Sequence, residues 1–131
     1  MSTINAVGRD RNNIELALDR GVCYPMERVN LYIRVTMETP SRPLLCLHIP
    51  QNAEVELIHM ADVDDNVLRV YSKPYAGRLL VIPLDKYLNM GASSEITVGI
   101  RLHTLSMNHY MSFCAWMAHE IPDERSDFFS S

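Results

Sequence analysis

The sequence has no large excess of charge of either sign. Its 131 residues include 12 basic and 16 acidic ones, which gives a net charge of −4. A domain that binds nucleic acid through its surface charge usually carries a marked excess of lysine and arginine. We therefore predict that nucleic acid is not a partner of this protein.

Long apolar runs are also missing. No stretch of 18 apolar residues occurs, as a membrane-spanning helix would require. The first residues also lack the basic-then-apolar order of a secretory signal. We therefore predict no membrane span and no secretory signal.

Cysteine is scarce and odd in number. Cys23, Cys46 and Cys114 lie far apart, each next to apolar residues. A disulfide framework usually needs an even number of cysteines in a small secreted chain. We interpret the three as free thiols of a cytoplasmic or other intracellular protein. A bridge between two of them, and a secreted or virion location, stay open at this stage.

No motif of a catalytic or metal site is present. The five histidines form no HxH or HExxH pair, no CxxC occurs, and P-loop, GxGxxG and GxSxG patterns are absent. Residues 62–66 begin like a calcium loop, but Val67 and Lys73 stand where an EF-hand needs glycine and glutamate. Cys114 lies in an apolar segment, where a thiol is buried rather than activated. We predict that the protein is not an enzyme and binds no metal or cofactor.

What the sequence does contain is a period of two. From Val29 to Glu38, apolar residues alternate strictly with polar ones. Such alternation is typical of a β-strand with one buried and one solvated face. The segment 110–118 is apolar on both faces, as in a central strand. The further predicted strands are 14–18, 45–49, 55–60, 67–71, 80–84 and 96–102.

These segments predict seven or eight short strands separated by turn residues. Such a pattern favours an all-β fold, an antiparallel β-sandwich that is immunoglobulin-like or jelly-roll-like, with little helix. A chain of 131 residues forms one domain. We place the sandwich at residues 14–119, between a flexible, polar N-terminal arm of residues 1–13 and an acidic C-terminal tail of residues 120–131.

Two parts of the chain resemble known families. Residues 75–84, followed by 95–102, resemble the late strands of the jelly-roll coat proteins of small viruses. Residues 21–35 resemble the second strand of immunoglobulin-like modules, although Trp116 follows Cys114 instead of lying between two cysteines. The first resemblance implies a coat-protein fold, and the second implies an immunoglobulin-like one. Neither implies functional residues.

The predicted solvated faces offer a candidate partner surface. Arginine outnumbers lysine ten to two and eight methionines are present, a composition that favours interfaces. Tyr32 and Arg34 lie on the solvated face of one predicted strand, and Arg101 and His103 on that of another. If the two strands are neighbours, these four residues form a polar and aromatic patch. The free edge of strand 29–38 is a further candidate contact.

The acidic tail contains two adjacent phenylalanines. Phe128 and Phe129 stand among aspartate, glutamate and serine residues. Because removing adjacent aromatic side chains from water lowers the free energy, we expect the two phenylalanines to fold back onto the sandwich or to dock on another chain.

We therefore expect a non-enzymatic function in protein–protein interaction or assembly, with a protein partner or self-association. Two alternatives stay open. One is a viral coat or virion-associated jelly-roll protein. The other is a module that binds carbohydrate or another small ligand, with Tyr71, Tyr75 and Tyr87 as an exposed stacking platform.

Overall fold

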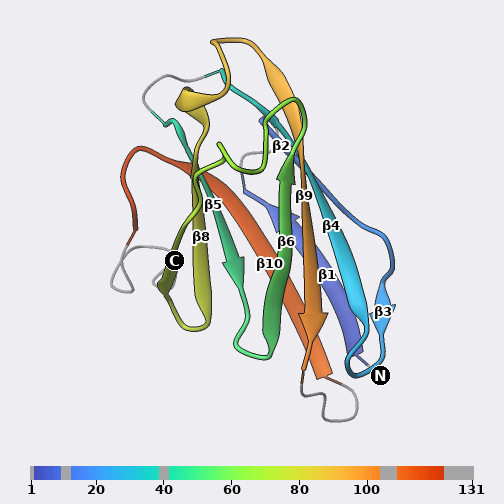
Figure 1. The fold of residues 1–131 in the computed structure, drawn as a ribbon. Coiled ribbons are helices and arrows are strands. Elements are labelled where there is room, and N and C mark those ends of the chain that lie inside the picture. The colour runs from blue at the N-terminus through green and yellow to red at the C-terminus, as the bar shows by residue number, and fades with distance from the viewer. Residues whose placement is uncertain (1, 10–12, 39–41, 104–108, 123–131) are drawn as a thin grey trace.

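The described chain folds into two β-sheets that pack together (Figure 1). The computed structural model describes residues 2–9, 13–38, 42–103 and 109–122. Sheet A has the strand order β3-β1-β10-β5-β8-β7, and sheet B has the order β2-β4-β9-β6. The strands are β1 (Ser2–Gly8), β2 (Ile14–Leu18), β3 (Val22–Cys23), β4 (Arg28–Thr36), β5 (Leu44–Ile49), β6 (Ala53–Met60), β7 (Tyr71–Pro74), β8 (Arg78–Pro83), β9 (Ser93–Leu102) and β10 (His109–Ala118).

The prediction of an all-β sandwich with little helix is confirmed. Within the described ranges, the only helical element is the short 3-10 turn η1 (Leu84–Lys86). The core fills the space between the two sheets and draws on both. Its largest fully buried side chains include Leu31, Ile33, Ile96 and Ile100 from sheet B, and Leu45, Ile49 and Phe113 from sheet A.

β4 lies inside sheet B, and its alternating sequence sets its two faces. Val29, Leu31, Ile33 and Val35 are each 0% exposed and pack in the core. β4 pairs with β2 on one side and with β9 on the other. The predicted strand is confirmed, whereas the expected free edge is wrong, because both edges of β4 are paired.

β10 lies inside sheet A, as expected for a strand that is apolar on both faces. Phe113 and Ala115 are 0% exposed and pack in the core. Trp116, on the opposite face, is partly buried in a second apolar cluster. β10 pairs antiparallel with β5 and parallel with β1, and every other pair among the described strands is antiparallel.

The N-terminal segment corrects one expectation. Residues 1–13 were expected to form an arm outside the sandwich, but β1 pairs with β10 along its whole length and Ile4 is 4% exposed. The sequence signal is weak because β1 contributes only Ile4 and Ala6 to the core. β1 and the two-residue β3 bring the number of strands in the described ranges to ten, instead of seven or eight.

The strand predicted at residues 67–71 is wrong in its position. Only Tyr71 belongs to β7, and the residues before it form a loop. The carbonyl oxygen of Asp64 accepts hydrogen bonds from the N–H groups of Val67 and Leu68, at 2.8 and 3.0 Å. Leu68 is 9% exposed and packs in the core. The apolar residues in this segment are therefore explained by a turn that packs in the core, and not by a strand.

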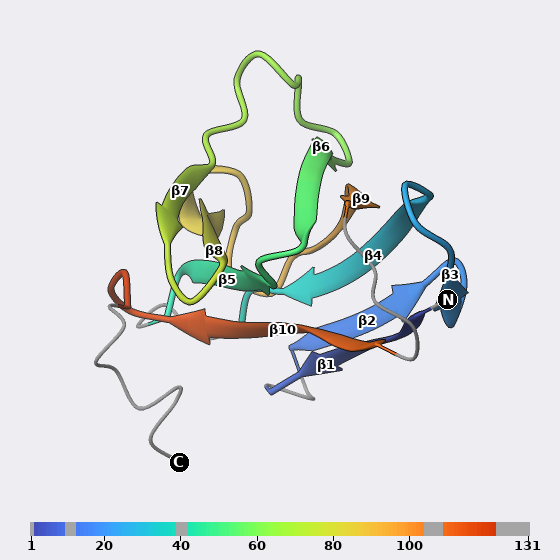
Figure 2. The same cartoon turned by 90° about the horizontal axis from the view of Figure 1, so that it is seen from below.

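β6 and β7 lie at the same side of the sandwich. Each is the last strand of its sheet, and the loop between them runs from one sheet to the other (Figure 2). No backbone pairing between β6 and β7 joins the two sheets there. A cleft lies on this side of the molecule.

Candidate interaction site

The cleft has a volume of about 630 Å³ and opens between β6 and the β7–β8 hairpin. Glu54 of β6, Ser72 of β7 and Arg78 of β8 supply polar groups at its border. This volume is in the range of sites that bind small molecules. Its apolar lining consists of Ile49, Ala53, Val55, Ile58, Val70 and Leu80.

A β-bulge in β6 places two consecutive residues on its exposed side. The register with β9 shifts between Val55 and Leu57, so that Glu56 is the extra residue. Glu56 and Leu57 are both exposed, whereas Val55 and Ile58 are partly buried against the core and line the cleft. Among the described strands, β6 pairs only with β9. The other edge of β6 therefore has no strand partner in this part of the chain.

The β7–β8 hairpin forms the opposite wall. Its turn contains two residues with positive φ, Ala76 at 45° and Gly77 at 122°. A side chain on Gly77 would overlap the carbonyl oxygen of Ile49, so the turn fits closely against the end of β5. Nη1 of Arg78 donates a hydrogen bond of 2.7 Å to Oγ of Ser72. This bond holds the guanidinium at the border of the cleft.

Hydrogen-bonded pairs of polar and charged groups continue from the cleft onto the outer face of sheet B. The carboxylate of Glu54 pairs with the imidazole of His103. Nε of Arg101 donates a hydrogen bond of 2.9 Å to the carboxylate of Glu56. This bond is the main reason why the pKa of Glu56 lies below its ordinary value, and the charge of Arg28 lowers it further.

The Glu56–Arg101 pair should make part of the stability depend on pH. Because the folded-state pKa of Glu56 is lowered, its carboxylate stabilises the fold above the ordinary value of 4.5, and this contribution is lost as the pH falls through the lowered value. Glu56→Gln is expected to reduce the urea midpoint of unfolding slightly at neutral pH, and to change it less in acid. Unfolding curves at the two pH values check this. An equal loss at both would contradict a role for the carboxylate charge.

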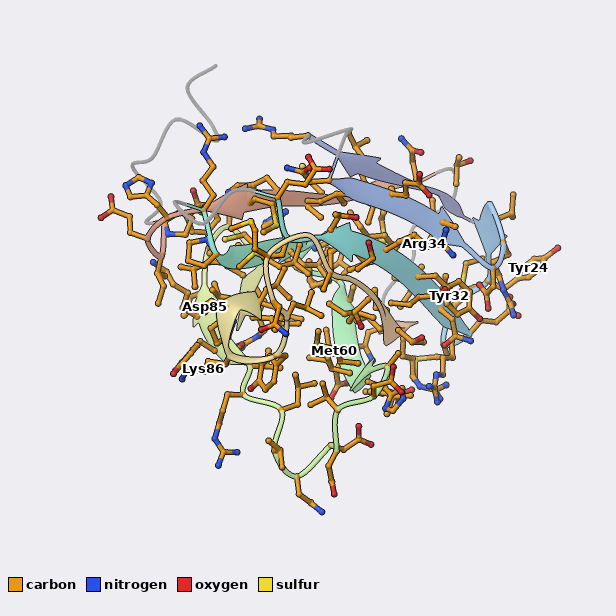
Figure 3. The ribbon with its side chains drawn as sticks, turned by 90° about the horizontal axis from the view of Figure 1, so that it is seen from above. Tyr24, Tyr32, Arg34, Met60, Asp85 and Lys86 are labelled. Carbon is orange, nitrogen blue, oxygen red and sulfur yellow. The ribbon has the colours of Figure 1, made fainter. Side chains whose placement is uncertain are left out.

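The four residues that were expected to form one polar and aromatic patch lie in two separate groups on sheet B. Tyr32 and Arg34 are on β4 (Figure 3), and Arg101 and His103 lie at the end of β9. Arg28, six residues before Arg34, is the cross-strand partner of Arg101. Six residues of a strand span about 20 Å. The two strands are neighbours as supposed, but the structure does not bring the four side chains into one patch.

The predicted tyrosine platform is wrong. Tyr71 is 48% exposed, but Tyr75 is 0% exposed and cannot stack on a ligand from solution. The hydroxyl of Tyr87 accepts a backbone hydrogen bond of 2.6 Å in the loop before β7. The three rings therefore do not form one exposed surface. The other predicted aromatic pair, Phe128 and Phe129, lies outside the described residues.

The sequence did not identify the cleft. Its lining comes from the end of β5, from β6, and from the loop and hairpin that follow, and only the sheet topology brings these segments together. One signal was present in β6. Ile58 is out of phase with Val55 in a strand of period two, which is typical of a bulge.

The three cysteines are free thiols, so the alternative of a bridge between two of them is excluded. Burial raises the pKa of Cys46 to about 12 and also raises the pKa values of Cys23 and Cys114. A thiol with a raised pKa has little reactive thiolate at neutral pH. All three therefore fit a structural role.

Comparisons with known proteins do not place the chain in a family. No protein-family model matches it, and no curated protein does. Within the described residues, no three histidine, cysteine or carboxylate side chains come together in a way that could hold a metal ion. The same part of the chain includes no helix long and apolar enough to cross a membrane.

Proposed function

We propose that this protein is a non-enzymatic interaction domain that binds an extended segment of a partner protein along the edge of β6. The observation that carries this proposal is that one edge of an eight-residue strand, which no described strand pairs with, borders a cleft with an apolar lining. In strand addition, the backbone groups of the edge provide affinity and pockets for alternate side chains provide specificity. Here the edge of β6 would supply the backbone groups, and the cleft would supply the pockets for side chains.

The lining of the cleft favours a segment with alternating apolar side chains. Those that face inward would contact Val55, Ile58 and Leu80 and would leave water. Glu54 and Arg78, which have opposite charges, would pair with polar side chains of the same segment. Charged residues and a bulge on an edge strand discourage unselective pairing, so we expect the partner to match the bulged shape of β6.

The sheet topology supports a jelly roll over an immunoglobulin-like sandwich. From β4 to β10, each strand lies in the sheet opposite to the one before it, except that β8 follows β7 within sheet A. A jelly roll alternates in this way, whereas the last two strands of an immunoglobulin-like sandwich lie in the same sheet. The parallel pairing of β1 with β10 departs from the antiparallel jelly-roll pattern.

This strand order favours a second candidate function, that of a viral coat or virion-associated protein. Jelly rolls are common in viral capsids. For a coat protein, the segment that binds along β6 would come from a second copy of the chain. Light scattering at high protein concentration distinguishes the two candidates: large symmetric oligomers would support a coat protein, and a monomer would contradict it.

Ile58→Lys is expected to weaken the binding of peptides at the cleft. It places a charge in the apolar lining, and an inward-pointing lysine on an edge strand opposes strand addition. Peptides are first selected on the unmodified protein from a displayed library of random sequences, and their affinities are then measured by calorimetry. We expect the substitution to weaken binding by about tenfold or more, which is about 1.4 kcal/mol.

Leu57→Lys is the matched control. It adds the same charge to the next residue of β6, which is 39% exposed and does not line the cleft. We expect it to leave peptide affinity nearly unchanged. Cooperative thermal unfolding shows that both variants are folded. The proposal fails if no peptide is selected, or if the two substitutions weaken binding equally.

A further inference from the structure

The outer face of sheet A is unusually apolar for a surface that should meet solvent. The register places Trp116, Cys46, Val81 and Tyr71 in one row across β10, β5, β8 and β7. The outer side of an antiparallel sheet in a sandwich usually carries polar side chains. Cys46 and Val81 are nevertheless 0% exposed. The outer-face cluster comprises buried Cys46, Tyr75, Leu79 and Val81, with Leu44, Trp116 and Ala118 partly buried around them.

Tyr75 covers part of this cluster. Its ring meets that of His48 edge-on, with 6.2 Å between the ring centres, and the ammonium group of Lys73 lies 5.7 Å from the ring centre. Nε2 of His48 also forms a hydrogen bond of 2.9 Å with the carbonyl oxygen of Tyr75. These contacts hold the turn after β7 against the sheet. Trp116, on the β10 side, is only partly buried, so the cover over this side is incomplete.

The described chain ends beside the same cluster. The carbonyl oxygen of Pro122 accepts a hydrogen bond of 2.5 Å from Nζ of Lys73. β10 ends at Ala118, and Lys73 lies on β7, at the edge of sheet A. The four residues after β10 therefore bring the chain back to the opposite side of the cluster. Whatever follows Pro122 starts next to exposed parts of an apolar surface.

We infer that residues 123–131 pack on the outer-face cluster of their own chain, with Phe128 and Phe129 against its apolar side chains. Phe128 is six residues after Pro122, and six extended residues span up to about 20 Å. Three strand spacings, about 14 Å in all, separate β7 from β10. The phenylalanines can therefore reach the whole cluster from the point where Lys73 holds the chain.

The charge of residues 123–131 also favours their packing on this cluster. Residues 123–131 carry three acidic side chains and one arginine. Lys73 borders the cluster on the β7 side, and Arg9 lies beside Cys114 on the β10 side. An acidic segment is therefore attracted to this face.

The contact between Lys73 and Pro122 favours the same chain over a second copy. It fixes the start of the segment at the edge of the cluster. A short tether of this kind gives an effective concentration in the millimolar range, well above the concentration of a separate molecule in dilute solution. We expect the segment to occupy its own cluster, and a second copy to find it filled.

The double substitution Phe128→Ser and Phe129→Ser tests this inference. Trp116 is the only tryptophan in the chain, so its fluorescence reports on the cluster. We expect its emission maximum to shift to longer wavelength in the variant. Labelling of Cys46 by a thiol reagent, followed by mass spectrometry, should become about tenfold faster or more, because the local opening that exposes the thiol costs less. Cys23, which is buried in β3, serves as the internal control and should react at an unchanged rate.

Ser130→Ala with Ser131→Ala is the matched control in the same segment and should leave both signals unchanged. The inference is overturned if the phenylalanine substitutions change neither the fluorescence nor the labelling rate. It is also overturned if the protection of Cys46 weakens on dilution while light scattering shows a dimer, because the segment then binds a second copy. Peptide binding at the β6 cleft should survive the phenylalanine substitutions, so this inference and the proposed function can fail separately.

Discussion

Phe113→Ala is expected to lower the free energy of unfolding by about 3–5 kcal/mol. Phe113 is 0% exposed and lies on β10, inside sheet A, with its side chain in the core between the sheets. The substitution deletes a buried aromatic ring and its contacts, and it leaves a cavity that the two sheets can close only in part. The net stability of a domain is only about 5–15 kcal/mol, so this loss is a large fraction of it. Guanidinium unfolding curves measure the change.

Ser112→Ala and Phe113→Leu complete this test. Ser112 is the preceding residue on β10 and is not part of the core, so its substitution should change stability by about 0.5 kcal/mol or less. Phe113→Leu keeps most of the apolar volume and should remain folded even if Phe113→Ala does not. The assignment of Phe113 to the core is wrong if Phe113→Ala costs no more than Ser112→Ala.

Gly77→Ala is expected to cost about 3 kcal/mol and also to weaken peptide binding at the cleft. Gly77 has φ of 122°, a backbone conformation that residues with a side chain rarely adopt. A Cβ atom there would overlap the carbonyl oxygen of Ile49 and would lie 3.1 Å from the carbonyl carbon of Pro50. The turn must therefore move away from β5. Arg78 and the wall of the cleft would move with it.

Gly21→Ala is the matched control for this substitution. A Cβ atom on Gly21 would meet no other atom within 4 Å, and its φ is outside the positive range. We expect its stability to be unchanged or slightly raised, because alanine reduces the conformational freedom of the unfolded chain. Thermal unfolding of both variants compares the two sites. Equal effects would contradict the close fit of the β7–β8 turn.

The strands that could be predicted from the sequence are those with a long alternating pattern. β4 alternates over nine residues and β9 over the seven residues 96–102, and both were expected close to where they lie. β1 could not be predicted, because two apolar residues are too few to show a period. Residues 67 and 68 led to a wrong strand prediction, because their apolar side chains belong to a turn. Leu68 is buried by a turn and not by a strand.

The candidate site was less predictable than the fold. Arg101 and His103 could be placed on a solvated face, but their carboxylate partners on β6 depend on which strand lies beside β9. The cleft depends on β7 pairing with β8 and leaving β6 at the edge. Neither fact follows from periodicity, because strand order is set by contacts between distant segments. The bulge at Glu56 then turns Ile58 toward the cleft.

Hydrogen–deuterium exchange in the presence of a selected peptide tests the role of β6 most directly. We predict that bound peptide slows exchange of amides in β6, because strand addition gives its free edge new hydrogen-bond partners. β2, which forms the opposite edge of sheet B, should exchange at an unchanged rate. Slower exchange at β2 or on the outer face of sheet A, with β6 unaffected, would contradict the account.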